Sequence, residues 1–222
     1  GVTVTETDKG MYVSYGGLDT TLIYTRGYSQ IERWVFSVMN SYRDTASVSL
    51  TVLKGDGSAW GEISYHPSIR IGLQDNLALP HFVDLHSGSA WDAASVTGHE
   101  PDVDMAAFWY LTSGTSSPTL TCPAYSSALT YYPLFATWSV KNQTMYDYYT
   151  SDNNLVTPAQ FELADNDSLL VTAYRPGSVS GQSKFACTGK VVPFRTADGK
   201  YGLIRVIRSD ETASGEMEIA VK

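Results

Sequence analysis

The sequence predicts an all-β protein. Apolar residues alternate at period two or come in short runs, turn residues separate these runs at fairly regular spacing, and helical periodicity is nearly absent. Successive side chains of a strand point to opposite faces, so an alternating pattern is typical of a half-buried strand. We therefore expect antiparallel sheets joined by short turns along most of the 222 residues.

The first third of the chain predicts a small antiparallel β-sandwich, which we assign to residues 1–73. Its clearest strand pair is 34–39 with 47–53, because both segments alternate and a run of turn residues separates them. Gly61 and Pro67 limit the segment 63–71 to an edge or broken strand, since proline has no amide hydrogen to donate. Further short strands are expected at residues 2–6, 12–15 and 21–24.

The remainder, residues 74–222, predicts a larger β-rich domain. Residues 103–111 are apolar on both faces apart from Asp104, which predicts a central strand, and residues 113–154 predict a long aromatic loop. Thr157 as N-cap with Pro158 at the first helical position predicts the only helix, over 158–165. Strands are expected at 81–86, 169–174, 190–196, 201–208 and 216–221, with a hairpin turn at Asp198-Gly199.

Composition narrows the class of protein. With 43% hydrophobic and 17% charged residues the chain is globular. A formal charge of −8, without a Lys/Arg cluster, argues against nucleic acid and anionic lipid as partners, because both are negatively charged. No run approaches the roughly 20 apolar residues that cross a bilayer.

Two features predict an exported protein. Thr, Ser, Tyr and Gly are abundant, and the chain starts at Gly1 without a Met, so we expect that a targeting segment has been removed. Cys122 and Cys187 are the two cysteines, and they fit two alternatives equally well. One is a disulfide closing a long loop, which suits an oxidising compartment, and the other is a pair of free thiols.

Motifs for catalysis or metal binding are missing from the sequence, which contains no G-x-S-x-G, H-E-x-x-H or C-x-x-C. His81 and His86 lie five residues apart, hence on opposite faces of a strand, and His99 fits a surface loop better than a metal site. Asp102 and Asp104 share a strand face, but we expect Asp102 in solvent and Asp104 capping a neighbouring loop. We therefore expect no catalytic residue, no metal and no cofactor.

Aromatic residues are the strongest candidates for binding. Tyr and Trp combine an apolar face with a hydrogen-bonding tip, which suits stacking under a sugar ring or anchoring a protein partner. Three Tyr within four residues cannot all point inward, so part of this belt is expected to face outward. Trp109 and Phe135 are expected in the core. The candidate ligand-binding residues are Trp138, Tyr146, Tyr148, Tyr149, Asn142 in their midst, and Trp91 in an earlier loop.

Three segments carry a resemblance to a known family. They are VVPFRTADGKYGLIRVI at 191–207 followed by GEMEIAVK at 215–222, FVDLHSG at 82–88, and DVDMAAFWY at 102–110. In order and spacing they resemble Bacteroidetes surface lipoproteins of the HmuY-like family, over residues 74–222. The resemblance implies a β-rich domain preceded by an Ig-like module, an outer-membrane anchor through a lipidated cysteine upstream of Gly1, and no enzyme activity.

The haem-binding pattern of that family is missing here. The family places two histidines between the segment matching 102–110 and the closing hairpin, whereas His66, His81, His86 and His99 all precede Val103. Met105 and Met145 are the soft candidate ligands in that interval. The departure argues against haem capture.

We therefore expect a non-catalytic binding lipoprotein of the outer membrane and cell surface. It would contact a glycan, or an outer-membrane protein partner in nutrient uptake, through its aromatic loops by stacking and hydrogen bonding. The main alternative is a structural or adhesive surface subunit, recognised by an exposed sheet edge that pairs between chains. Haem or metal capture and hydrolysis are less favoured.

Overall fold

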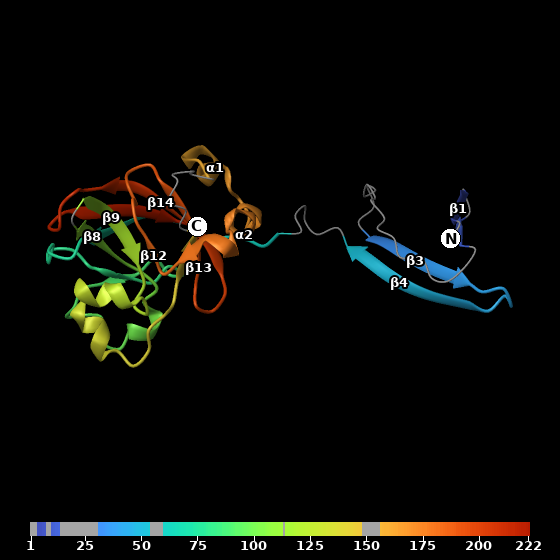
Figure 1. Cartoon of the computed structure of the whole chain (residues 1–222), viewed down its shortest axis with the longest axis horizontal. Helices are drawn as coiled ribbons and strands as arrows, with labels where there is room; N and C mark the ends of the chain where they lie inside the picture. Colours follow the sequence, from blue (N-terminus) through green and yellow to red (C-terminus); the bar gives the residue numbers. More distant parts are fainter. Residues whose placement is uncertain (1–3, 8–9, 14–30, 54–59, 113, 148–155) are drawn as a thin grey trace. The chain divides into compact units, whose positions relative to one another are not determined.

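The computed structural model describes residues 4–7, 10–13, 31–53, 60–112, 114–147 and 156–222. The chain divides into two units, Gly1–Ser58 and Ala59–Lys222 (Figure 1). The sequence pattern predicts a domain boundary after residue 73, whereas the boundary between the two units falls after Ser58. The prediction fails because the strand that contains Pro67 pairs with the last strand of the chain and belongs to the second unit.

The first unit contains two antiparallel hairpins in its described part. β1 (Val4–Thr7) pairs with β2 (Gly10–Val13), and β3 (Ile31–Met39) pairs with β4 (Thr45–Leu53) over their full lengths. The predicted strand pair 34–39 and 47–53 is thus confirmed. The strand predicted at 21–24 lies outside the described residues, and the Ig-like sandwich stays a prediction.

The second unit is built on a six-stranded antiparallel sheet with the order β11-β10-β13-β14-β15-β5. The predicted hairpin at Asp198-Gly199 is confirmed, since β13 and β14 pair across it and Gly199 has a φ of 93°, a conformation that glycine adopts without strain. The strands are β5 (His66–Gly72), β10 (Met145–Asp147), β11 (Val179–Ser180), β13 (Val191–Arg195), β14 (Tyr201–Ser209) and β15 (Glu216–Val221).

A three-stranded sheet with the order β12-β9-β8 and a short β6–β7 pair are the other sheets described in this unit. Their strands are β6 (Phe82–Val83), β7 (Ala90–Trp91), β8 (Ala106–Thr112), β9 (Thr115–Thr121) and β12 (Gln182–Ser183).

The predicted central strand at 103–111 corresponds to β8, which is an edge of its sheet. Its two faces are nevertheless both buried, because they pack into two different core clusters: Ala107 into one, Ala106 and Phe108 into the other. Burial on both faces therefore arises from packing between layers and not from two neighbouring strands. Strand β9 lies inside the predicted loop 113–154, where its Ser, Thr and Pro residues hide the strand pattern.

The predicted helix is present, but it is not the only helix of the unit. The predicted helix is α1 (Pro158–Leu163), and Thr157 and Gln160 form a capping box at its start. The strand predicted at 169–174 is wrong, because this segment is α2 (Ser168–Ala173), whose Leu170 packs against β14 and β15. A short apolar run fits either structure. Four 3-10 helices are also described: η1 (Glu100–Asp102), η2 (Ser126–Thr130), η3 (Pro133–Thr137) and η4 (Pro176–Ser178).

Lys222 fixes helix α1 to the sheet. Its ammonium donates hydrogen bonds to the carbonyl groups of Phe161, Glu162 and Ala164 at 2.8, 3.1 and 2.8 Å. These carbonyl groups lie at the C-terminal end of the helix, where positive charge is favourable.

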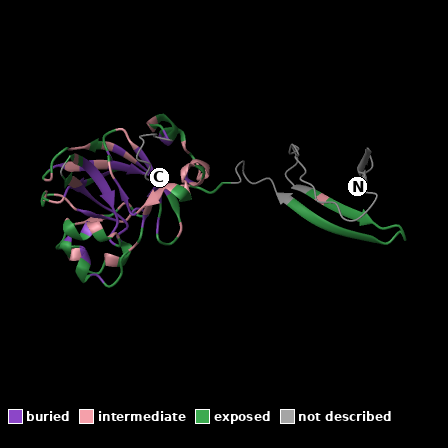
Figure 2. Ribbon diagram, viewed as in Figure 1, coloured by how far each residue is buried: buried purple, intermediate pink, exposed green. Residues whose placement is uncertain are grey.

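The core of the second unit has three buried clusters (Figure 2). The first lies between the inner faces of the six-stranded sheet and the β8–β9 pair, as Ile71, Ile204 and Leu120 illustrate. The second is aromatic and gathers the side chains of β6, β8, η2 and η3. The third packs α1 and α2 against β14. The clusters lie between successive layers of the unit, so both the six-stranded sheet and the β8–β9 pair bury residues on two faces.

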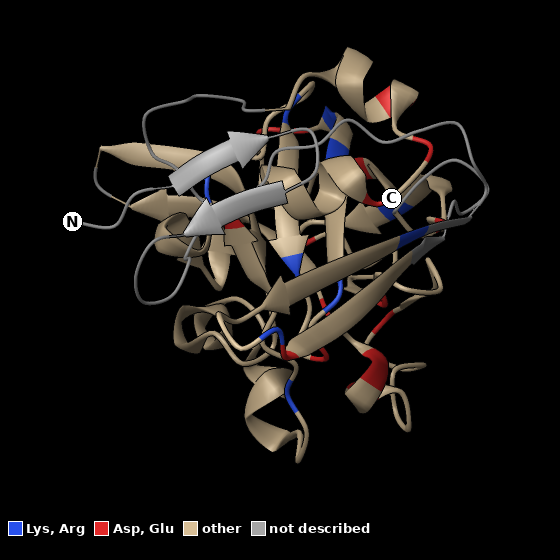
Figure 3. Cartoon of the chain, turned by 90° about the vertical axis from the view of Figure 1, so that its right-hand side faces the viewer, with Lys and Arg blue, Asp and Glu red and all other residues tan. Residues whose placement is uncertain are grey.

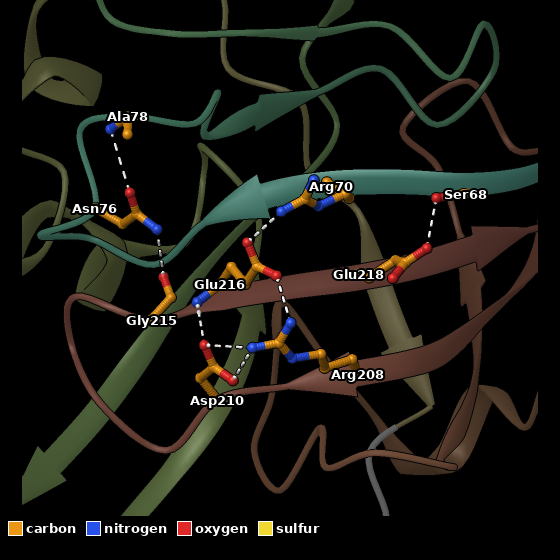
Figure 4. Close-up of polar contacts among 9 residues, drawn as sticks. All are labelled: Ser68, Arg70, Asn76, Ala78, Arg208, Asp210, Gly215, Glu216 and Glu218. Carbon is orange, nitrogen blue, oxygen red and sulfur yellow. Dashed lines mark hydrogen bonds and ion pairs between the residues drawn. The ribbon is translucent and has the colours of Figure 1, made fainter.

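The outer face of β5, β15 and β14 carries a charge network (Figure 4). Glu216 pairs with Arg70 at 2.7 Å and with Arg208 at 2.8 Å, and Arg208 also pairs with Asp210 at 3.1 Å. Charged residues along the edge strand β5 discourage pairing with another chain. Figure 3 shows acidic and basic residues interspersed along the described segments of the ribbon.

Cys122 is buried and Cys187 is exposed, and no disulfide joins them. Of the two alternatives that the sequence allows, the structure therefore has the one without the disulfide. In the described ranges, no helix is long and apolar enough to cross a membrane.

Candidate functional site

Two of the rings predicted to face outward, those of Trp138 and Tyr146, are internal. Trp138 is 7% exposed and Tyr146 is fully buried, so the prediction of outward-facing rings is wrong for both. Trp138 packs against Phe82 and Phe135 with centroid distances of 5.4 and 4.7 Å. Tyr148 and Tyr149 lie outside the described residues.

Tyr146 is internal because it belongs to a strand and not to a loop. Strand β10 lies between β11 and β13, and the Tyr146 hydroxyl donates a hydrogen bond to the carbonyl group of Thr121 at 2.9 Å. Burial raises the pKa of this phenol well above its ordinary value, so it stays protonated. The side chain links the two larger sheets and offers no surface to a ligand.

The other two predicted residues lie nearer the surface. Trp91 is half-buried and stacks on His99 at 4.6 Å, and the imidazole of His99 lies 3.3 Å from Asp102. Asn142 donates hydrogen bonds through its amide to the carbonyl group of Pro101 at 2.7 Å and to Asp104 at 3.2 Å. Asn142 lines a cleft together with Asp102 and Asp104, and Trp91 is connected to the same cleft through His99 and Asp102.

We call this the acidic cleft. It has a volume of about 220 Å³ and lies where the turn after β6, helix η1, the segment before β10 and the β13–β14 turn meet. Lys and Arg are absent from its wall. The polar residues that line it are Asp84, His86, Asp102, Asp104, Asn142 and Asp198.

Asp84 shapes one side of the acidic cleft. Its carboxylate accepts hydrogen bonds from the amide of His86 at 2.7 Å and from the hydroxyl of Ser87 at 2.7 Å, which folds the chain into a tight turn. Gly88 closes the turn with a φ of 71°, and its Cα lies so close to the His66 ring that a Cβ would be 2.5 Å from it. The His86 side chain is thereby directed to within 3.5 Å of Asp198.

Asp104 is the buried acid of this cleft, with 3% of its surface exposed. Its two carboxyl oxygens accept hydrogen bonds from the Leu85 amide and from Asn142, both at 3.2 Å, which confirms the predicted capping role. Burial raises its pKa to about 6. A carboxyl with a raised pKa beside ionised acids is a feature of glycosidases, but here protein donors occupy both of its oxygens. Its contacts therefore favour a positioning role.

We expect Asp104→Asn to change how stability depends on pH. Because the folded pKa of Asp104 is about 6 and its ordinary value is 3.8, the folded chain keeps a proton that the unfolded chain loses between these values. The free energy of unfolding should then fall as pH rises from about 4 to about 6, by an amount on the order of 2–3 kcal/mol. In the variant this fall is absent. Urea denaturation of both proteins at pH 4 and pH 7 measures it, and equal differences for the two would contradict the account.

A second cleft, of about 290 Å³, lies on the other side of the β13–β14 turn. We call it the tyrosine cleft. Its floor is apolar, formed by the buried side chains of Leu85, Leu170 and Phe194. Its rim carries the exposed ring of Tyr201 together with Lys200 and His86.

Tyr201 holds a defined position at this rim. Its ring meets Tyr174 edge-on at 5.3 Å, and the guanidinium group of Arg195 lies 5.5 Å from its centroid. At 36% exposure it is the most exposed aromatic ring that lines either cleft. The tyrosine cleft therefore combines an apolar floor with a polar rim, to which the charged residues Glu62, Asp167 and Lys222 also contribute.

No family model matches this chain, and no curated protein matches it. Among solved structures, the fold is similar to that of a DUF4466 family protein from Parabacteroides merdae ATCC 43184, with a TM-score of 0.50 and 15% sequence identity. The match covers 85% of this chain and 60% of that one, so the chain spans less than two thirds of that protein. At this identity the similarity concerns the fold alone.

The site has no preformed place for a metal ion within the residues that the structure describes, where no group of three or more His, Cys, Asp or Glu side chains is placed to hold one. Its groups are suited to non-covalent binding: carboxylates and an amide for hydroxyl groups, and a phenol ring for an apolar face.

Sequence reasoning missed Tyr201, His86 and Asp198 as site residues. Tyr201 follows the Asp198-Gly199 turn, which the sequence shows plainly, and a ring next to a predicted hairpin turn is a usable signal. No sequence pattern around His86 indicates that it lies beside the Asp198-Gly199 turn, because the two are far apart in the sequence and come together only in the folded unit.

Proposed function

We propose that the chain is a non-catalytic cell-surface binding protein that holds a carbohydrate in the tyrosine cleft. The observation that carries this proposal is the composition of that cleft, where an exposed Tyr201 ring and polar side chains surround an apolar floor. A sugar ring has an apolar C–H face and a polar rim of hydroxyl groups, and it needs both kinds of contact.

The acidic cleft next to it restricts the class of carbohydrate. Four of its lining residues are aspartates, and the whole chain carries a formal charge of −8. Uronic acids and sulfated sugars would be repelled, whereas neutral hydroxyl groups can donate hydrogen bonds to carboxylates. We therefore infer a neutral glycan.

The proposed location at the cell surface is supported by sequence motifs and not by the fold. The segment 191–207 and the two segments that precede it resemble HmuY-like surface lipoproteins of Bacteroidetes, which supports an outer-membrane anchor through an upstream lipidated cysteine. An Ig-like module in residues 1–58 would then separate the binding unit from the membrane. Such a protein would deliver its glycan to an outer-membrane partner in nutrient uptake.

We expect Tyr201→Ala to weaken glycan binding about tenfold or more, because buried aromatic contacts at binding sites commonly contribute over 1 kcal/mol. A neutral-glycan array identifies the ligand, and calorimetric titration then compares the two proteins. Tyr42→Ala is the matched control, since Tyr42 is 86% exposed and lines neither cleft. Unchanged affinity of a folded Tyr201→Ala protein would overturn the site assignment.

A second candidate function is a structural or adhesive subunit, which one observation favours. Strand β4 is nine residues long, carries no charge and no proline, and pairs only with β3 in the described part of the unit. Hairpins with long uncharged edges pair readily with other chains. Concentration-dependent dimers in sedimentation of the full chain, without any glycan binding, would favour this function over the first.

A further inference from the structure

A third cleft lies beyond the acidic cleft. We call it the tryptophan cleft, because the exposed part of Trp138 lines it together with Leu134 and Val96. Thr97 and Glu100 add polar groups, and its volume is about 210 Å³. It resembles the tyrosine cleft in pairing an aromatic side chain with apolar and polar neighbours.

The tyrosine and acidic clefts share a lining residue, and the acidic and tryptophan clefts are lined by nearby residues of the same segments. His86 lines both the tyrosine cleft and the acidic cleft, and the β13–β14 turn contributes Thr196 to the former and Asp198 to the latter. On the far side, η1 contributes Glu100 to the tryptophan cleft and Asp102 to the acidic cleft.

The segment 138–142 also contributes residues to both the acidic and the tryptophan cleft. Trp138 lines the tryptophan cleft and Asn142, four residues later, lines the acidic cleft. The hydrogen bond of 2.7 Å from Asn142 to the carbonyl group of Pro101 ties this segment to η1. The acidic cleft is therefore the middle one, with a cleft containing an aromatic residue on each side.

The volumes indicate what kind of ligand fits. At about 290, 220 and 210 Å³, each cleft is smaller than the roughly 300–1,000 Å³ of a pocket that encloses a drug-sized molecule. Each has room for a single ring or a short segment. A ligand that occupies all three clefts must therefore be a chain of small units.

We propose that the tyrosine, acidic and tryptophan clefts are three consecutive subsites for one linear, neutral oligosaccharide. The inference rests on the proposed function and adds the form of the ligand: a chain of at least three sugar units. One outer unit stacks on the exposed ring of Tyr201, and the other is held by the polar groups Thr97 and Glu100 beside the small exposed part of Trp138. The hydroxyl groups of the middle unit donate hydrogen bonds to Asp102, Asp198 and the side-chain amide oxygen of Asn142.

The test is a length series measured on the full chain. Neutral oligosaccharides from one to six units, of the linkage found on the array and of a β-1,4-glucan series, are titrated calorimetrically against wild type and Thr97→Trp. Thr97 is exposed and lines the tryptophan cleft, so a tryptophan there fills the cleft without removing a core side chain. Thr130→Trp is the matched control, because Thr130 is exposed and lines none of the three clefts.

We expect affinity to rise at least tenfold from the monosaccharide to the longer chains. Thr97→Trp should remove that gain and leave the binding of the monosaccharide unchanged, while Thr130→Trp should behave as wild type. If affinity is the same at every length, or if Thr97→Trp binds the hexasaccharide as wild type does, the three-subsite inference is wrong and the proposed function stands. If no oligosaccharide of any length binds, the proposed function itself is wrong.

Discussion

Replacing Phe82 with alanine is expected to lower the free energy of unfolding of the second unit by about 3–5 kcal/mol. The Phe82 side chain is 2% exposed, and its ring contacts Tyr132, Phe135 and Trp138 at centroid distances of 5.5, 5.4 and 5.4 Å. Removal of the ring leaves a cavity that these neighbours cannot fill without leaving their own rotamers. Aromatic packing adds to the loss, because edge-to-face pairs stabilise beyond their buried area.

Urea denaturation followed by fluorescence and circular dichroism measures this change. Leu77→Ala is the control, since Leu77 is 83% exposed and its truncation should alter the free energy of unfolding by less than about 0.5 kcal/mol. If Phe82→Ala unfolds with nearly the free energy of wild type, the aromatic cluster is not the core of this unit and the burial of Trp138 would need another explanation.

Arg175→Ala has the second large expected effect, a loss of about 2–4 kcal/mol. The side chain of Asp147 is 1% exposed, and its carboxylate accepts two hydrogen bonds of 2.9 Å from the guanidinium group of Arg175. Without that group a buried carboxylate is left facing one remaining donor, the amide of residue 175 at 3.1 Å. Such a charge is costly, because it has lost its hydration without gaining a partner.

Arg70→Ala is the matched control for this pair. Arg70 also pairs with a carboxylate, that of Glu216 at 2.7 Å, but its side chain is 57% exposed, so the loss of stability should be much smaller than for Arg175→Ala. A double variant, Asp147→Asn with Arg175→Ala, should recover part of the stability, since it removes the unpaired charge. Equal losses for Arg70→Ala and Arg175→Ala would contradict the distinction between the exposed and the buried pair.

Strand patterns predicted much of the sheet framework. The pair β3–β4, the β13–β14 hairpin and the last strand lie where alternation and turn residues place them, because each is formed by residues close together in the sequence. Strand β9 and helix α2 were not predicted. The strand is rich in Ser and Thr, and the helix is too short to show a helical period.

The candidate site could be predicted only in part. Asn142 and Trp91 were singled out from sequence, and Asn142 lines the acidic cleft while Trp91 contacts it through His99. Trp138 and Tyr146 were proposed as binding residues because the rings of their segment cannot all point inward, but the sequence does not show which of these rings are buried, and tertiary packing buries these two. His86 and Asp198 are 3.5 Å apart in space, and no local pattern brings them together.

The most direct test of the central claim is a map of where the ligand binds. Amide signals of the isotope-labelled chain are followed by NMR while the best-binding neutral oligosaccharide from the array is added. The account predicts the largest shifts at His86, Asn142, Asp198 and Tyr201, around the β13–β14 turn and the two clefts beside it. Shifts confined to the β3–β4 hairpin, or to residues distant from all three clefts, would contradict it.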